Sequence, residues 1–478
     1  MRTSNKILLG TALILVSQLA TADTLWAIYE KARQNDPQIR EADANRLATR
    51  EGKPQAFGAL LPQIDAGGTY SNDERESDSR GISFGNVPGT TARSSDEDTG
   101  NWQVQLRQTL FRWDQWVRFR QADKQATQAD IDYRVAELSL YTRVADAYFN
   151  VLAAEDSLAA NVSAREAIGR QLEQAQKRFE VGLIAITDVQ EAQSGYDQSV
   201  AAEILGKRQL ANSKEVLREI IGDYPGELAK PRTEIPLVSP APASETEWVE
   251  TALQQNLSLQ SAQLGADIAR DNIRIARAGR YPTVDVVASH GDTRVRGDST
   301  SLFTPDIAPD PDVEPVTTLT ATDGDTDTIR LEVNVPVFSG GSTSARVQEN
   351  VYRHRAAKER LERVARQTER QTRDAFLAVT SEISRVKALQ QALKSAQTAL
   401  QATEAGFEVG TRTTVDVLAA RQQLAQAETN YARSRYDYIV NVLKLKEAAG
   451  TLGDSDVRDV NTWLEDRPAP AATPQTPD

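Results

Sequence analysis

Cysteine is absent from the 478-residue sequence, and histidine occurs only twice. Without cysteine, the sequence excludes a disulfide framework, a thiolate metal site and the acylated N-terminal cysteine of a lipoprotein. The two histidines, His290 and His354, have no metal-ligand pattern near them, and each is interpreted as a surface residue. The sequence therefore predicts neither a metal site nor a cofactor.

Motifs typical of enzymes are missing as well. The sequence has no phosphate-binding glycine loop and no nucleophile elbow, and its many carboxylates include no pair that stands out. Arginines gather in residues 353–373, but glutamates interrupt them at helical spacing, as in Glu359 with Arg363, which is typical of a solvated helix. Because the formal net charge is −13, we expect neither an enzyme nor a nucleic-acid-binding protein.

Long hydrophobic runs are scarce, and the clearest one lies near the N-terminus. Residues 7–16 are largely apolar, follow Arg2 and Lys6, and precede the small-x-small sequence Ala20-Thr21-Ala22. The run is too short to span a bilayer, so residues 1–22 are predicted to be a signal peptide, cleaved before Asp23. Loss of Arg2 and Lys6 would take the net charge from −13 to −15. We expect an exported protein.

Proline and glycine are nearly absent from two long tracts. Residues 112–180 contain no proline and only Gly169, and residues 344–408 contain no proline and only Gly406. Each tract predicts one helix of about 100 Å. Apolar residues recur in both at every seventh position, a stripe typical of coiled-coil packing; they are Ile131, Leu138, Ala145 and Leu152, then Val379, Val386, Leu393 and Leu400.

The sequence contains an internal repeat, with the same order of predicted elements in each half. Phe179-Glu180-Val181-Gly182 recurs as Phe407-Glu408-Val409-Gly410. Each copy reads helix, strand, polar loop, strand, long helix, turn and helix. We predict a first repeat over 23–230, a linker rich in proline over 231–246, a second repeat over 247–465 and a disordered tail over 466–478.

Four strands are predicted, at about 62–70, 101–111, 282–290 and 329–338. Apolar and polar residues alternate in them, as an ordinary half-buried strand also shows. Strands of about ten residues can also cross a bilayer at a tilt. Both pairs flank long polar segments, 71–100 and 291–328, which resemble the outer loops of membrane barrels. Because four strands cannot close such a barrel, membrane strands would require several chains to share one.

Several segments of this sequence resemble motifs of the TolC family. Residues 178–190 and 409–418 resemble the two helix-turn signatures of that family, and residues 32–37, 60–63 and 147–152 are also similar to it. The resemblance implies a mainly α fold with a transmembrane β part. Three chains would give four strands each to a 12-stranded β-barrel, which a long α-helical coiled-coil barrel continues across the periplasm.

The resemblance also implies a function and partners. The protein would be the outer-membrane exit duct of tripartite multidrug efflux or type I secretion systems in a Gram-negative bacterium. A homotrimer in outer-membrane lipid would dock on a periplasmic adaptor and an inner-membrane RND or ABC pump. It would pass drugs or proteins without chemistry of its own. The alternative is a periplasmic or surface coiled-coil structural or adaptor protein without a channel, which leaves the duplicated strand pairs unexplained.

Two turns near residues 182 and 410 carry the candidate site residues. The simplest interpretation of each turn is a helical hairpin, with Thr413 and Asp416 as a capping pair. The resemblance adds a gate, in which Arg412 links to Thr187 and Asp188 and Asp416 forms an acidic ring.

The sequence departs from the family pattern at two positions of this gate. Phe407 replaces a tyrosine, so it can pack in the gate but its ring has no hydroxyl to reach Asp188. Ala419 replaces a second aspartate, which leaves one acidic ring. We therefore expect a gate with fewer bonds and weaker blockade by cations than is typical of the family.

Overall fold

The computed structural model describes residues 22–83, 87–232, 235–307 and 314–465. Apart from Ala22, the predicted signal peptide 1–22 lies outside the described residues, as does the predicted tail 466–478. The chain divides into two compact units. The helical unit lies within residues 1–46, 130–262 and 361–478, and the sheet unit comprises residues 47–129 and 263–360.

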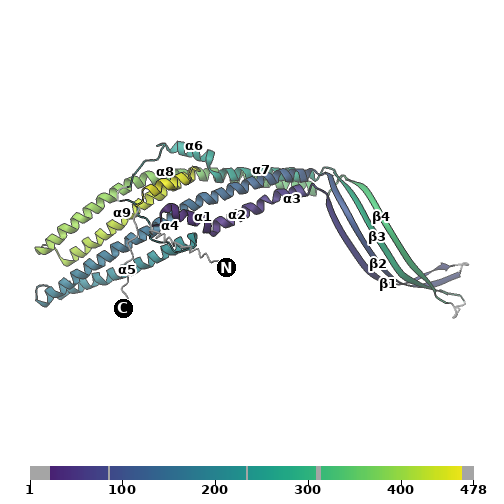
Figure 1. Ribbon diagram of the computed structural model, residues 1–478, viewed down its shortest axis with the longest axis horizontal. Coiled ribbons are helices and arrows are strands. Elements are labelled where there is room, and N and C mark those ends of the chain that lie inside the picture. Colours follow the sequence, from purple (N-terminus) through teal and green to yellow (C-terminus); the bar gives the residue numbers. More distant parts are fainter. Residues whose placement is uncertain (1–21, 84–86, 233–234, 308–313, 466–478) are drawn as a thin grey trace, which may run out of the picture. The chain divides into compact units, whose positions relative to one another are not determined.

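The elements follow one another in two similar series (Figure 1). The first series is α1 Leu25–Asn35, α2 Pro37–Arg50, α3 Gly52–Gly58, β1 Gln63–Ser83, β2 Val87–Phe111, α4 Trp113–Glu180 and α5 Ile186–Ile221. The second series is α6 Glu245–Gln255, α7 Leu257–Ala278, β3 Thr283–Pro305, β4 Val316–Asn334, α8 Ser342–Glu408 and α9 Thr414–Ala449, followed by α10 Asp454–Thr462. Each series places a strand pair before a long helix, a turn and a second helix, so the predicted tandem structural repeats are confirmed.

The two longest helices are α4, with 68 residues, and α8, with 67 residues. They occupy the tracts in which proline is missing, where no backbone hydrogen bond of the helix is lost. Stripe residues of both helices are buried in the helical unit, including Ala145, Leu152, Val379 and Val386. The apolar side chains that recur every seven residues therefore face a packed interior.

The core of the helical unit joins residues of both series. Phe149 of α4 stacks on Tyr436 of α9, with ring centroids 5.7 Å apart. The hydroxyl of Tyr148 donates to the carbonyl of Ala229 at 2.7 Å, and burial raises the pKa of this tyrosine. Helices α1, α5, α6 and α10 contribute further buried apolar side chains. The two repeats thus share one core here rather than folding separately.

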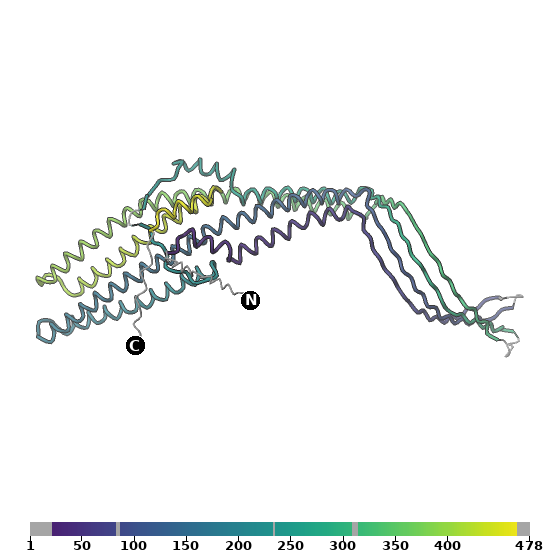
Figure 2. Tube along the Cα trace, viewed as in Figure 1, coloured from purple at the N-terminus to yellow at the C-terminus, as the bar shows by residue number. Residues whose placement is uncertain are grey.

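The sheet unit contains one antiparallel four-stranded sheet, in the order β1-β2-β3-β4. Figure 2 shows the four strands running side by side, from the purple first pair to the green second pair. Within the described ranges, β1 and β4 each have one neighbouring strand. The sheet of one chain therefore ends in two open edges.

The strands are longer than the sequence predicts. Residues 71–100 and 291–328 were expected to be loops, yet β1 continues to Ser83, β2 begins at Val87, β3 reaches Pro305 and β4 begins at Val316. Antiparallel backbone pairing does not need apolar side chains, and polar cross-strand pairs support it here. The hydroxyl of Tyr70 donates to Asp98 at 2.6 Å, for example.

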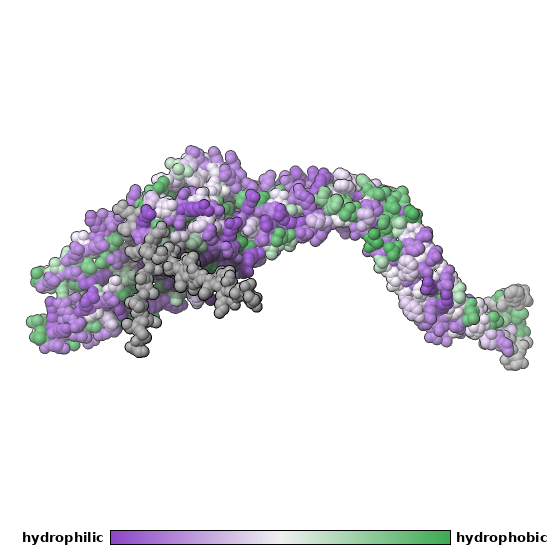
Figure 3. Space-filling view, in the orientation of Figure 1, coloured by the Kyte–Doolittle hydropathy of each residue, from purple (hydrophilic) through white to green (hydrophobic). Residues whose placement is uncertain are grey.

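Apolar side chains of the sheet are exposed where the strands approach the helices of this unit, and Figure 3 shows hydrophobic residues gathered there. On β4, Ile329 is 83% exposed and Leu331 is 62% exposed. None of the described helices is both long and apolar enough to cross a membrane.

Candidate functional site

The α4–α5 and α8–α9 turns have the same bonded geometry. Gly182 donates its N–H to Phe179 at 2.8 Å with φ +73°, and Gly410 donates its N–H to Phe407 at 3.1 Å with φ +79°. A second hydrogen bond of 2.8 Å closes each turn. It runs from the N–H of Leu183 to the carbonyl of Arg178 in the first turn and from the N–H of Thr411 to the carbonyl of Gly406 in the second. A side chain at either glycine would be strained in this left-handed conformation. The predicted glycine turns are therefore present in both hairpins.

The predicted capping pair at the start of α9 is also present. Asp416 Oδ2 accepts the N–H of Thr413 at 2.9 Å and its hydroxyl at 3.0 Å. The N–H of Asp416 donates to Thr413 Oγ1 at 3.3 Å. The bond from the Thr413 N–H, then that from its hydroxyl, lowers the pKa of the Asp416 carboxyl. Asp188 makes the matching bond at α5, where its Oδ2 accepts the N–H of Ala185 at 3.3 Å.

The two turns contact each other through Arg178 and Phe407. The Arg178 guanidinium lies over the Phe407 ring, 4.9 Å from its centroid. A cation over an aromatic face contributes about 0.5–1 kcal/mol at exposed sites. The predicted gate-packing residue thus joins the ends of α4 and α8 within one chain.

Behind the turns, α5 packs closely against α9. A Cβ atom on Gly195 would lie 3.1 Å from Leu418 Cδ1, so only glycine allows the present separation without movement. Leu418 is buried, as are Val189 and Ala192 of α5. The first turns of α5 and α9 therefore belong to one packed layer.

Arg412, Thr187 and Asp188 do not meet in this chain. The side chain of Arg412 folds back toward α8, where a Cβ on Gly406 would lie 2.8 Å from Arg412 Cγ. Within the described part of the chain, the Arg412 guanidinium makes no hydrogen bond or ion pair. Gly406, the only glycine of residues 344–408, therefore leaves space for the side chain of Arg412.

Exposed apolar side chains surround both turns. Val181 is 69% exposed, Leu183 is 72% exposed and Val409 is 75% exposed. Figure 3 shows hydrophobic residues at the ends of both hairpins. We call Val181, Leu183 and Val409 the tip patch.

Arg178 is the residue of this candidate site that the sequence did not single out. It stands in the first helix-turn signature, next to Phe179, but its contact lies far along the chain. The only local signal is an asymmetry between repeats, since the residue before Phe179 is Arg178 and the residue before Phe407 is Gly406. Across the described ranges, no cluster of three or more histidine, aspartate or glutamate side chains could hold a metal ion.

The chain is similar to known proteins along most of its length. The sequence model of the family described as outer membrane efflux protein matches residues 28–223 and 248–451. Outer membrane protein TolC of Vibrio cholerae is 36% identical over 459 residues, covering 96% of this chain and 98% of that protein. TolC of Escherichia coli is 35% identical over 480 residues, covering 99% of this chain and 92% of that protein. Alkaline protease secretion protein AprF of Pseudomonas aeruginosa is 28% identical over 458 residues, covering 94% of this chain and 89% of that protein.

Solved outer-membrane channels have a similar fold. The CmeC channel of Campylobacter jejuni gives a TM-score of 0.69 at 16% identity, covering 94% of this chain and 91% of that chain. VceC of Vibrio cholerae gives a TM-score of 0.67 at 20% identity, covering 89% of this chain and 96% of that chain. At these identities the likeness concerns the fold alone.

Proposed function

The chain belongs to the outer membrane efflux protein family, and we propose that its α4–α5 and α8–α9 turns form the gate of the duct. The family confirms the predicted function, since the chain is an outer-membrane channel for efflux or secretion and not an enzyme. It extends into the periplasm. Its four-stranded sheet with two open edges is one chain's share of the family's trimeric 12-stranded barrel.

One observation carries the gate proposal: the two hairpin ends of a single chain meet at Arg178 and Phe407. A gate has to hold adjacent helices together by contacts weak enough to be broken. Because a cation–π contact at an exposed site contributes about 0.5–1 kcal/mol, a docking partner can break it. The ring of Phe407 supplies this contact without a hydroxyl.

Arg412 would add links between chains. Arg412 is exposed, and its guanidinium attracts the Asp416 carboxylate of the same chain without forming an ion pair with it. The guanidinium is therefore available to Thr187 and Asp188 of a neighbouring subunit. Such a bond contributes roughly 0.2–1 kcal/mol when exposed and about 1.5–3 kcal/mol when shielded from water. Three equivalent links per trimer would close the gate reversibly.

Asp416 would form the acidic ring of the constriction. One oxygen, Oδ2, caps α9, and the other makes no hydrogen bond within the described residues, so it can face the duct. Three copies of this carboxylate would attract cations to the narrowest point. Because position 419 is alanine, we propose a single ring.

The tip patch would bind the periplasmic adaptor. Val181, Leu183 and Val409 are more exposed than apolar side chains usually are, and they lie on the two turns that would face the inner membrane. The adaptor would join the duct to an inner-membrane RND or ABC pump. The family description names efflux, and the relative AprF is named for alkaline protease secretion, so we keep both drugs and proteins as candidate cargo.

Planar-bilayer conductance of the purified protein tests the gate. We expect small steps from the unaltered protein and larger steps from Arg412→Ala and from Arg178→Ala. Loss of about 1 kcal/mol per link shifts the ratio of closed to open gates roughly fivefold for each link that is lost, and a trimer of either variant loses all of its equivalent links.

Arg208→Ala is the matched control, because Arg208 is an exposed arginine of α5 outside the turn. Its conductance should equal that of the unaltered protein. Unchanged steps in both Arg412→Ala and Arg178→Ala would remove the gate assignment and leave the duct in place.

A further inference from the structure

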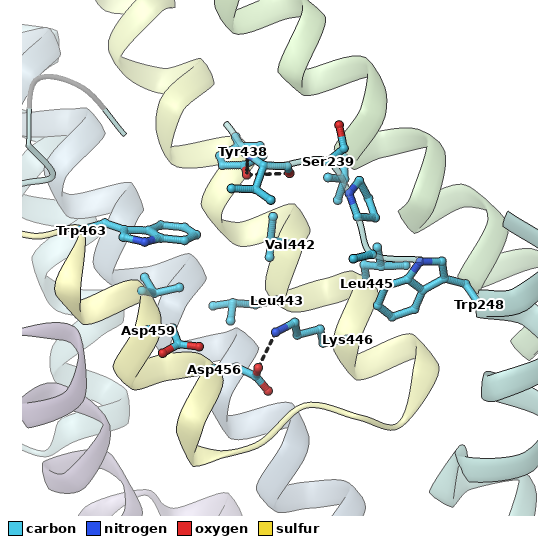
Figure 4. A pocket seen from close by; sticks show the side chains of 15 residues that line it. Ser239, Trp248, Tyr438, Val442, Leu443, Leu445, Lys446, Asp456, Asp459 and Trp463 are labelled. Carbon is cyan, nitrogen blue, oxygen red and sulfur yellow. Dashed lines mark hydrogen bonds and ion pairs between the residues drawn. The ribbon is translucent and has the colours of Figure 1, made fainter. Parts of the chain in front are cut away.

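A cavity lies in the helical unit away from the two turns, between α9, α10 and residues 238–241 (Figure 4). Its volume is about 270 Å³. The inner wall is apolar and buried, with Val379, Leu443 and Val460 among its residues. An engineered apolar cavity of roughly 150 Å³ holds benzene. This cavity can therefore hold one aromatic ring with a short side chain.

Most polar groups of the wall already have partners. The indole N–H of Trp248 donates to the carbonyl of Pro242 at 2.8 Å. The hydroxyl of Tyr438 accepts the N–H of Val238 at 2.9 Å. Lys446 is paired with Asp456, as the dashed line in Figure 4 marks. A ligand in the cavity would meet the flat faces of these rings rather than their polar atoms.

The carboxylate of Asp459 is different, because it makes no hydrogen bond or ion pair within the described residues. Two basic side chains, one in the cavity wall and one next to Asp459 in sequence, are engaged elsewhere. Lys446 is held by Asp456, and the guanidinium of Arg458 lies over Trp26, 4.4 Å from its ring centroid. Asp459 is exposed, so the wall of the cavity carries one solvated negative charge without an ionic partner among the described residues.

Aromatic side chains line the same cavity as Asp459. Trp463, one helical turn after Asp459, stacks on Tyr438 with ring centroids 6.5 Å apart and an interplanar angle of 19°. Figure 4 shows Asp459 and Trp463 on the same side of the cavity. A cavity whose wall carries both a carboxylate and aromatic rings favours a cation, because the negative charge and the ring quadrupoles each attract it.

We propose that this cavity binds a small amphiphilic amine, whose aromatic or branched alkyl group enters the cavity and whose ammonium group binds Asp459. An anion would be repelled by the carboxylate. A neutral apolar ligand would shield the carboxylate from water without giving it a partner, which is unfavourable. The bound amine would contact α9, α10 and the segment before α6. This proposal does not depend on the gate.

Isothermal titration calorimetry of the full chain in detergent tests the site, with 2-phenylethylammonium as the probe. We expect saturable binding of one ligand per chain. Asp459→Asn should weaken the affinity about two- to fivefold, because it removes an ionic bond at an exposed carboxylate. Asp459 is exposed, so this substitution leaves the packing of the wall intact.

Two controls make the result specific. Glu250→Gln removes a carboxylate from the exposed face of α6, outside the cavity, and should bind the probe with unchanged affinity. The neutral analogue 3-phenylpropan-1-ol should bind more weakly than the ammonium ion. The absence of saturable binding, equal binding of the alcohol, or equal effects of Asp459→Asn and Glu250→Gln would each overturn the proposal.

Discussion

Asp416 connects local structure and function at the scale of a single residue. Its carboxylate is bonded to the N–H and the hydroxyl of Thr413, and it is also the candidate acidic ring of the duct. Both roles require the ionised form. Protonation would therefore affect the start of α9 and the constriction together.

We predict that the first turn of α9 loosens in acid. Folding lowers the pKa of Asp416 below its ordinary value of 3.8. A carboxyl with a lowered pKa contributes stability above the unfolded pKa and loses it as the pH falls through the folded pKa. Hydrogen exchange of residues 413–417, followed by mass spectrometry, should show constant protection from neutral pH down to 3.8 and a loss of protection below it.

Asp416→Asn provides the comparison for this acid effect. An amide does not titrate, so the variant should show no such step, and at neutral pH it should be less protected than the unaltered protein. An identical acid step in the variant would assign the effect to another group.

Phe407 shows how one substitution can preserve a contact while changing its chemistry. The departure from the family pattern removes a hydroxyl but keeps an aromatic face, and Arg178 lies over that face. The link between the hairpins therefore depends on a cation and a ring. High salt weakens ion pairs between exposed charges, and a ring contact of this kind has no second formal charge to be screened.

At the scale of elements, the close approach of α5 to α9 is decided by Gly195. The neighbouring Leu418 is buried, and its Cδ1 would lie 3.1 Å from a Cβ added at this glycine. We expect Gly195→Val to destabilise the paired hairpins by about 1–3 kcal/mol, because the added methyl groups overpack this layer. Hydrogen exchange should increase at residues 189–199 and 414–424.

Gly265→Val is a suitable control for that experiment. It places the same β-branched residue in helix α7, where a Cβ would meet only the end of the Gln128 side chain at 3.5 Å. Exchange at α5 and α9 should not change in the control. Equal exchange in both variants would show that overpacking at Leu418 has no effect.

At the scale of the whole molecule, acidic charge predominates. The chain has 68 acidic and 55 basic side chains, and the acidic ring proposed at the constriction has the same sign. We predict that the open duct prefers cations, because a negative lining attracts them and repels anions. Reversal potentials in a salt gradient would measure the preference.

Much of this charge can instead lie on outward surfaces, where it aids solubility. The gradient experiment separates the two arrangements. A reversal potential of the sign expected for anion preference would rule out an acidic lining, and Asp416→Asn would then leave the value unchanged.

The sequence by itself determined the elements and the family of this protein, because those signals are local. Scarcity of proline and a period of seven predict α4 and α8, and period two predicts the apolar parts of the four strands. The glycine turns and the Thr413–Asp416 cap follow from residues three to five positions apart. The polar parts of the strands escaped prediction because their pairing rests on backbone hydrogen bonds, which leave no pattern of hydrophobic residues.

Only the tertiary structure decided which distant residues meet. Arg178 contacts Phe407, and Gly195 contacts Leu418, across more than two hundred positions of sequence. Asp459 lines a largely apolar cavity, and no basic side chain of the described residues pairs with it. Such contacts depend on how the helices of the two repeats pack against each other, and packing is set by the complete three-dimensional arrangement of side chains rather than by the order of residues along one helix.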